Sequence, residues 1–432
     1  MTIYNITFDK LNLLQSKLQP GDSVLIKDGE YKNQNIKLSS IGNFNNNIII
    51  KPKNKGKVIL SGKLYLLIDG SYITFKNFIL KNGGIKDGVK IKGVGNRISG
   101  CDISYECDGP VISIYDKYTR IDNCKIYKIK KFNTCIKIKT FISNYILIDH
   151  NIFRNINIQL ETQNNNIENA RIILVSNIFE NSDSINIRTS KNIIYKNIFI
   201  KTKDLNLRYG NKSIIAKNFF LSGSGGINIT GENHIIYGNF FKEITGNKTQ
   251  NACISVLNGK QFDKKYTQVK KLKVYKNIFI NNEIDIILGI PKNEADLLPL
   301  KCKFKENIIY KTNENPIFGY KGRGIQESKF INNKYYANNV GNNPLNSLNN
   351  LFNIKEFRLK DLKINLDIDF DIDLDINFDI NNIFNNNNFE LDIEKLLNSK
   401  IKKDNFQIEI NIYYQKIKKE ILEKIISLNK EK

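Results

Sequence analysis

The run IILVSNIFENSDSINIRTSKNIIYKNIFIKTKDLNLRYGNKSIIAKNFF, residues 172–220, carries the signature that decides the fold. A short β-branched segment followed by Asn-x-Phe occurs in it three times, with the asparagines at 177, 197 and 218, and occurs again at Asn239. The successive gaps are 20, 21 and 21 residues, and they are filled with Ile, Thr, Asn and Gly. A βαβ unit needs a helix inside each repeat, so we predict instead a single-stranded right-handed parallel β-helix with one coil per repeat.

Further copies of the signature extend the repeat to Asn77-Phe78, Asn151-Ile-Phe153 and Asn277-Ile-Phe279. In such a solenoid the aliphatic and Phe side chains point inward and stack on the next coil. Each Asn lies at a turn, where it tolerates a left-handed φ and where its amide bonds to neighbouring coils. The wider gaps, 38 residues from Asn239 to Asn277 and 30 from Asn277 to Asn307, predict loops of the kind that wall a binding groove.

The two ends of the chain differ from the repeat. Residues 7–18 predict a short amphipathic helix that caps the open end of the solenoid, and LQPGDSVLIKDGEY, residues 18–31, predicts strand–turn–strand. We place the β-helix in residues 1–340 and a C-terminal extension in residues 341–432. Within the extension, residues 365–380 alternate apolar residues with Asp or Asn. They form either an acidic, cation-binding strand or a biased linker or edge strand, and we favour the second interpretation.

An Asn-rich run follows, and the helical spacing of apolar residues in 410–430 predicts a terminal amphipathic helix that docks on the solenoid or mediates association. The N-terminus shows no signal peptide, and no stretch approaches the roughly 18 apolar residues of a membrane span. We therefore expect a soluble protein without a membrane span. The sequence indicates neither its compartment nor its oligomeric state.

The formal net charge of +23 suggests a polyanionic partner, such as an acidic polysaccharide, a nucleic acid or an anionic surface. The alternative cause is codon bias that places Lys on solvated faces, and the two explanations carry equal weight. The six cysteines form no CxxC pair and are irregularly spaced, so buried, reduced thiols are expected rather than a metal or redox motif. Cys101 and Cys124 occupy similar places in neighbouring repeats.

Four runs resemble a known family. LQPGDSVLIKDGEY and KGKVILSGKLYLLIDGSYITFKNFILKNGG, residues 55–84, look like the N-terminal coils of polysaccharide lyase family 6, which includes chondroitinase B and alginate lyases. LNLRYGN, residues 205–211, and GGINITGENHIIYGNFF, residues 225–241, look like its central coils. The resemblance covers roughly residues 5–340. It implies a right-handed parallel β-helix, which agrees with the repeat.

The resemblance also implies a reaction. Family members cleave uronic-acid polysaccharides by β-elimination, in which a Lys removes the C5 proton, an Arg assists the leaving oxygen, and Ca²⁺ neutralises the carboxylate. The family's Leu-x-Leu-Arg-His-Gly run places the acid at Arg208, with Tyr209 in place of the His. Counting back from Asn192 without a gap places Arg188 at the Lys position, whereas a small gap places Lys191 there. An Arg is a poor base because its guanidinium stays protonated.

The Ca²⁺ ligands of the family are an Asn and a Glu-x-Glu shortly before the Lys. Here the acids available in that stretch are Glu180 and Asp183, and Asn155 or Asn157 corresponds to the family Asn. A Ca²⁺ ion takes 6–8 oxygen ligands, so this set is a poor match to the family's site.

Substrate contacts are predicted from the same coils. The resemblance implies that Tyr209 and Asn228 face the substrate, although Asn228 replaces an Arg of the family's Gly-Gly-Ile-Arg-Ile run. His234, within the retained Gly-Glu-Asn-His, either contacts the sugar or caps a turn.

These observations leave two hypotheses in competition. The first is a lyase that acts on an alginate- or chondroitin-type polysaccharide. The second is a degenerate β-helix that binds acidic glycans without cutting them or serves as a structural or adhesion protein. We do not expect nucleic-acid binding, because no such motif is present and the aromatic residues fall on the core-facing repeat.

Overall fold

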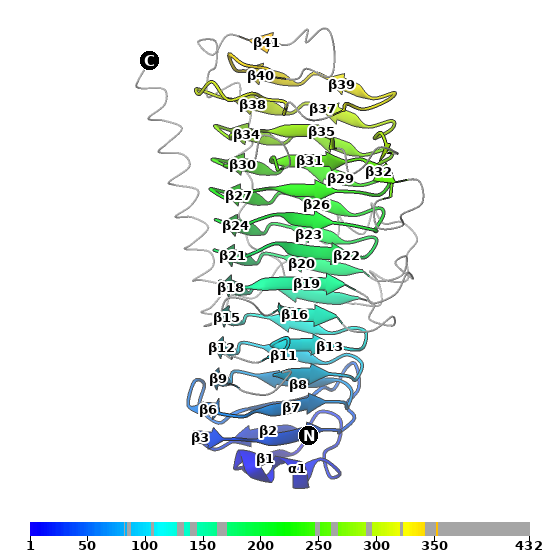
Figure 1. Ribbon diagram of the computed structural model, residues 1–432. Coiled ribbons are helices and arrows are strands. Elements are labelled where there is room, and N and C mark those ends of the chain that lie inside the picture. Colours follow the sequence, from blue (N-terminus) through cyan, green and yellow to red (C-terminus); the bar gives the residue numbers. More distant parts are fainter. Residues whose placement is uncertain are drawn as a thin grey trace. The chain divides into compact units, whose positions relative to one another are not determined.

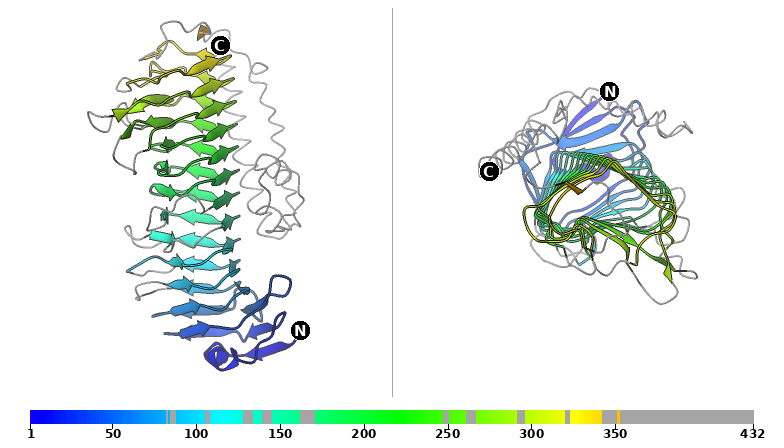
Figure 2. Two further views of the ribbon diagram at one scale, coloured as in Figure 1. Left: turned by 90° about the vertical axis from the view of Figure 1, so that its right-hand side faces the viewer. Right: turned by 90° about the horizontal axis from the view of Figure 1, so that it is seen from above.

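The computed structural model describes residues 1–81, 83, 88–104, 108–127, 134–138, 145–161, 171–246, 251–260, 267–290, 296–319, 323–341 and 351–352. In these residues the chain forms three long parallel sheets whose strands follow one another in the order A, B, C around each coil. Figure 1 shows the coils stacked one on the next, and Figure 2 shows them from above, where they lie over one another. The predicted right-handed parallel β-helix is confirmed.

Sheet A contains the strand that opens each coil. Its members, in spatial order, are β1 Ile3–Ile6, β2 Ser23–Ile26, β5 Ile48–Pro52, β8 Ile73–Lys76, β11 Arg97–Ser99, β14 Arg120–Asp122, β17 Ile146–Asp149, β20 Ile172–Val175, β23 Ile193–Tyr195, β26 Ile214–Ala216, β29 Ile235–Tyr237, β33 Lys273–Tyr275, β37 Lys303–Lys305 and β39 Lys329–Ile331.

Sheet B follows a short turn after sheet A. Its members are β3 Gly29–Lys32, β6 Val58–Ser61, β9 Ile79–Lys81, β12 Asp102–Ser104, β15 Lys125–Tyr127, β18 Ile152–Arg154, β21 Ile178–Glu180, β24 Ile198–Ile200, β27 Phe219–Leu221, β30 Phe240–Lys242, β34 Ile278–Ile280, β38 Ile308–Tyr310, β40 Lys334–Tyr336 and β41 Leu351–Phe352.

Sheet C completes the coil. Its members are β4 Asn35–Leu38, β7 Tyr65–Ile68, β10 Val89–Ile91, β13 Ile112–Ile114, β16 Thr134–Ile138, β19 Asn157–Glu161, β22 Ile185–Arg188, β25 Leu205–Leu207, β28 Ile227–Ile229, β31 Ile254–Leu257 and β35 Ile286–Ile290. Two strands outside the coils, β32 Gly259–Lys260 and β36 Asp296–Leu297, pair antiparallel, and both lie in segments where the repeat spacing is wide.

The N-terminal end is capped as the sequence predicted. A 3₁₀ turn, Phe8–Lys10, continues into the short helix α1, Leu11–Leu14, and the side chains of Phe8 and Leu11 are fully buried in the core. The strands all belong to a compact unit that runs from Met1 to Lys355. The predicted acidic segment at 365–380 and the predicted helix at 410–430 lie outside the described residues, so both stay predictions.

A ladder of buried asparagines joins the coils at the turn between sheets A and B. Each Asn side-chain Oδ1 accepts two bonds from the preceding Asn, one from its main-chain N–H and one from its Nδ2, at 2.8–3.0 Å. Each Nδ2 also donates to a main-chain carbonyl of the preceding coil, as Asn218 does to Ile194. The members are Asn151, Asn177, Asn197, Asn218, Asn239, Asn277, Asn307 and Asn333.

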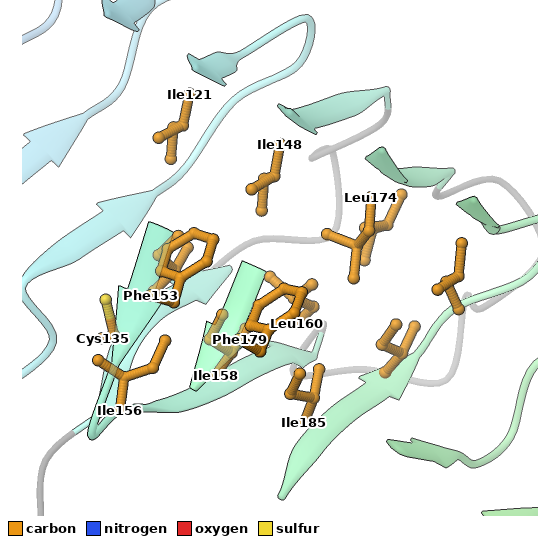
Figure 3. Close-up of a cluster of buried hydrophobic side chains, with 14 of the residues drawn as sticks. Ile121, Cys135, Ile148, Phe153, Ile156, Ile158, Leu160, Leu174, Phe179 and Ile185 are labelled. Atoms are coloured by element: carbon orange, nitrogen blue, oxygen red, sulfur yellow. The ribbon is translucent and has the colours of Figure 1, made fainter. Parts of the chain in front are cut away.

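A second ladder consists of phenylalanine rings two residues further on. Consecutive rings of Phe153, Phe179, Phe199, Phe220, Phe241 and Phe279 lie nearly parallel, with centroids 4.6–5.0 Å apart. Figure 3 shows Phe153 and Phe179 beside each other within the aliphatic core. The rings fill the space that one coil alone would leave open to water, so burial favours the stack.

The cysteines agree with the expectation of buried thiols. Cys101, Cys124, Cys135, Cys253 and Cys302 are buried and free, and Cys107 lies outside the described residues. Cys101 and Cys124 occupy the turn position that Asn takes in later coils, and the main-chain N–H of Cys124 donates to Oδ1 of Asn151. Thiols therefore stand at the N-terminal end of the asparagine ladder.

The ladder gives a stability prediction. Asn218→Ala removes four bonds and takes from two buried donors of Asn197 the acceptor that they share. We expect the free energy of unfolding to fall by about 2–4 kcal/mol in denaturant titrations, because unsatisfied buried groups are costly. The control, Asn206→Ala, removes two bonds between side-chain amides on an outer face and should cost about 1 kcal/mol. Equal losses would contradict this account of the ladder.

Candidate functional site

The outer face of sheet C is polar around β22, β25 and β28. Along each strand, residues alternate between the core and this face, so Ile185 and Ile187 are buried while Asn186 points outward. Asn186, Asn206 and Asn228 occupy one register position, and their side chains form a second amide ladder. Nδ2 of Asn206 donates to Asn186 Oδ1 at 3.1 Å, and Nδ2 of Asn228 donates to Asn206 Oδ1 at 3.0 Å.

Arg188 and Arg208 are neighbours on this face. Arg188 ends β22, Arg208 directly follows β25, and the register pairs Ile187 with Leu207 immediately before them. The main-chain N–H of Arg208 donates to the Ile187 carbonyl at 3.0 Å, which continues the ladder past the pair. Both arginines are partly buried. The structure therefore places Arg188 directly beside Arg208 in the register of adjacent strands.

Tyr209 belongs to the same cluster. It has a φ of +67° in the turn after Arg208, and the Arg188 guanidinium carbon lies 5.3 Å from the centre of its ring. A guanidinium over an aromatic face is held by a cation–π attraction. Tyr209 thus supports Arg188 from the next coil, which the sequence alone did not indicate.

Lys191 lies elsewhere in the coil. It stands three residues beyond Arg188, in the turn between sheets C and A, with a φ of +56° and its main-chain N–H donating to the Asn211 carbonyl. It occupies the register position of Lys212 rather than that of Arg208. The structure does not bring Lys191 and Arg208 to equivalent positions.

Both carboxylates among the nominated calcium ligands are held in ion pairs. Glu180 ends β21 in sheet B and pairs with Arg154 at 2.7 Å, and Asp183 lies in the turn before β22 and pairs with Lys203 at 2.7 Å. Asn155 lies in a turn with a φ of +52°, and its N–H donates to the Glu180 carbonyl. Among the described residues, no three His, Cys, Asp or Glu side chains group around a common point. A Ca²⁺ site formed by Glu180, Asp183 and Asn155 therefore stays a prediction.

The structure adds one carboxylate that sequence comparison missed. Asp204, Asn206 and Arg208 alternate along β25 and its flanks, so all three face outward from sheet C. Oδ1 of Asp204 is buried and has no hydrogen-bond partner, and it occupies the space where a side chain at Gly225 would begin. Burial raises the pKa of Asp204 to about 6, against the opposing effect of the positive charges of Arg208 and Lys203. The alternating sequence Asp-x-Asn-x-Arg was the signal that could have identified Asp204 as a residue of this face.

Of the predicted substrate contacts, Asn228 lies on the outer face of sheet C, where its Oδ1 is buried without a partner. Asn157, the second candidate for the family's Asn, faces outward from β19 and likewise has a buried, unpartnered Oδ1.

His234 is fully buried. Its Nδ1 accepts from the Ser213 N–H at 3.1 Å, and its Nε2 donates to the Thr230 carbonyl at 3.0 Å. Burial lowers the pKa of His234 to about 4, so the ring is neutral at physiological pH. This corrects the prediction of a direct sugar contact, because neither ring nitrogen reaches the surface. His234 caps a turn, which was the other interpretation of its motif.

Comparison with known proteins agrees with this fold. The model of the chondroitinase B family matches residues 8–392. A polysaccharide lyase of family PL6 from Pseudopedobacter saltans is 20% identical, with a TM-score of 0.62 over 80% of this chain and 97% of its own. A mannuronic-acid-specific family 6 lyase from human gut microbiota is 22% identical, with a TM-score of 0.57 over 77% and 82% of the two chains.

An alginate lyase solved with an oligosaccharide is 18% identical, with a TM-score of 0.60 over 79% of this chain and 85% of its own. No curated protein matches the sequence significantly. The coils and the family match together define a β-helix of the polysaccharide-lyase class. The chain belongs to the chondroitinase B family. Among the described residues, no helix is long and apolar enough to cross a membrane.

The raised pKa of Asp204 gives a testable pH dependence. The native carboxyl keeps its proton up to about pH 6, whereas an unfolded Asp loses it near pH 4, so its ionisation lowers stability as pH rises through that window. Asp204→Asn should therefore melt at a higher temperature than the wild type at pH 7.5, and this advantage should vanish near pH 4.

Calorimetry at both pH values measures this effect. The control is Asp183→Asn, which removes an exposed carboxylate paired with Lys203 and should show no such gain at pH 7.5. An Asp204→Asn melting temperature that differs from the wild type equally at both pH values would contradict the assignment.

Proposed function

We propose that this chain cleaves a uronate-containing polysaccharide, of alginate or chondroitin type, by β-elimination on the outer face of sheet C. The observation that carries the proposal is the placement of Arg188 and Arg208 at equivalent positions of adjacent strands, with Tyr209 against Arg188. The backbones of the two arginines are about one strand spacing apart, roughly 4.8 Å, so their side chains start close enough to serve a carboxylate and the oxygen of a neighbouring glycosidic bond. Membership of the chondroitinase B family supports the reaction class.

The proposed roles follow from the chemistry of each side chain. Arg188 neutralises the uronate carboxylate, which acidifies the adjacent C5 proton, and Arg208 assists the departing C4 oxygen. Arg188 is unsuited to remove the proton, because a guanidinium stays protonated. Arg188 and Lys191 are the two candidates for the base. Lys191 lies in the same coil as Arg188, and an amine, unlike a guanidinium, can serve as a general base. No step of the proposed reaction involves a metal ion.

A catalytic test uses purified chain with alginate, chondroitin sulfate and dermatan sulfate, and measures the ultraviolet absorbance of the unsaturated uronate product. We expect turnover on at least one polymer, and Arg208→Ala should reduce kcat/KM by about 10²-fold or more. The matched control is Arg154→Ala, which removes the same charge from an exposed pair on sheet B and should change the rate by less than about twofold.

Metal chelation tests the role given to Arg188. If Arg188 neutralises the carboxylate, a chelator leaves the rate unchanged and Arg188→Ala abolishes it. Loss of turnover on chelation, with recovery on adding Ca²⁺, would overturn that role.

A second function, binding of acidic glycans without cleavage, is favoured by one observation. The residue beside Arg208 in the strand register is Arg188 rather than a lysine, and the described residues bring no three acidic, His or Cys groups together. This function predicts saturable, salt-sensitive binding with no absorbance change on any of the three polymers. The same assay, combined with a binding measurement, separates the two functions.

A further inference from the structure

A line of polar and aromatic residues runs along the turn between sheets C and A, and we call it the corner stripe. Its members stand directly before the strands of sheet A, and the strand registers place them at one position in successive coils. In order they are Tyr72, Gly95, Tyr118, Tyr145, Arg171, Lys191, Lys212, Asn233, Lys271 and Lys301. The stripe advances by about 4.8 Å per coil, the spacing of hydrogen-bonded strands.

The N-terminal part of the stripe is aromatic. The rings of Tyr118 and Tyr145 are parallel within 1°, with centroids 5.3 Å apart, and the Arg171 guanidinium carbon lies 5.4 Å from the Tyr145 ring centre. All three side chains are partly buried and lie outside the core. This corrects the expectation that the aromatic residues all fall on the core-facing repeat. A stacked ring pair outside the core is the kind of surface on which planar or ring-shaped ligands lie.

Backbone strain accompanies these rings. Tyr118 and Tyr145 have φ values of +59° and +65°, a conformation that costs a non-glycine residue on the order of 1 kcal/mol and that Asn adopts more readily. Gly95 lies between Tyr72 and Tyr118, and a Cβ there would come within 2.6 Å of the Tyr72 ring. A glycine at that rung therefore lets the Tyr72 ring extend over it, toward Tyr118. Lys191 and Lys212 share this φ in later coils, so the turn itself imposes the conformation and the rings are placed by it at the outer corner.

The C-terminal part of the stripe is cationic. Lys212, Lys271 and Lys301 are exposed, and each has a φ between +53° and +56°. Of the acids near them, Glu232 pairs with Lys270 and Glu327 pairs with Lys301. Lys191 and Lys212 belong to the coils that carry Arg188 and Arg208, so the stripe passes beside the candidate site.

We propose that the corner stripe is a docking surface for a linear acidic polysaccharide that lies along the solenoid axis. Sugar rings pack on Tyr118 and Tyr145, and carboxylates or sulfates along the polymer pair with Arg171, Lys212 and Lys271. A regular polymer with an acidic group on each sugar fits a surface that offers one side chain per coil. The inference rests on the polymer class of the proposed function, but it holds whether or not the bound chain is cut.

The chain provides a matched control for charge. Lys212 and Lys217 flank strand β26 in one coil, and Lys271 and Lys276 flank β33 in a later coil. The pair Lys212 and Lys271 therefore occupies the same two coils as the pair Lys217 and Lys276. All four lysines have a φ between +52° and +56°. Lys212 and Lys271 lie on the corner stripe, whereas Lys217 and Lys276 lie on the turn between sheets A and B. The two double variants therefore change net charge and backbone context equally.

The experiment measures binding of size-defined alginate oligosaccharides to the full chain by calorimetry at physiological salt. Lys212→Gln with Lys271→Gln should weaken binding about tenfold, because the surface loses two charges that face the polymer. Lys217→Gln with Lys276→Gln should change affinity by less than about twofold. Equal weakening by both double variants would overturn the proposal, because it would show attraction by net charge alone.

Two further variants test the aromatic part. Tyr118→Asn and Tyr145→Asn should weaken binding about threefold or more, while the melting temperature stays equal or rises because Asn accepts the positive φ. Unchanged affinity in both would overturn the role of the rings. Single-stranded DNA provides a further comparison. If it binds more tightly than alginate and its binding also needs Lys212 and Lys271, the ligand of the corner stripe is a nucleic acid and the glycan proposal is overturned. Binding without unsaturated product would remove the proposed cleavage and leave the docking surface standing.

Discussion

The fold depends on the buried hydrogen-bond ladder of asparagines between sheets A and B. Each side chain is bonded to the coil before it and the coil after it, through its own amide and through main-chain groups. A slip of one residue in any coil would leave several buried polar groups unpaired, and each would cost about 1–3 kcal/mol. The ladder therefore does more than hold coils together, because it allows a single register along the stack.

That register determines which side chains share a face. The Phe rings follow the ladder by two residues and stack in the core, while the alternation along sheet C turns Asp204, Asn206 and Arg208 outward. The same register places Arg188 beside Arg208, and it places Lys191 in the turn between sheets C and A. The asparagine ladder thus fixes which side chains meet at the candidate site, although it lies on another part of the coil from Arg188 and Arg208.

The repeat and the N-terminal cap were predictable because they rest on local patterns: an Asn-x-Phe signature once per coil, and apolar spacing near Phe8 and Leu11. The sequence left Arg188 and Lys191 as alternatives for the family's Lys position, because a single gap moves the alignment from one to the other, and only the register shows that Arg188 is the neighbour of Arg208. Burial was harder to predict. His234 keeps a family motif, yet both its ring nitrogens bond to the main chain inside the stack. The corner stripe changes residue type along its length, so only the register reveals that Tyr118, Arg171 and Lys212 are aligned.

Cysteine cross-linking tests the register at the site most directly. Equivalent residues of adjacent parallel strands are about 4.8 Å apart, within the Cα separation of roughly 4.4–6.8 Å that a disulfide spans. We expect Arg188→Cys with Arg208→Cys to form a disulfide readily under mild oxidation, as mapped by peptide mass spectrometry. Lys191→Cys with Arg208→Cys should not. Cross-linking of the second pair but not the first would contradict the register on which the account depends.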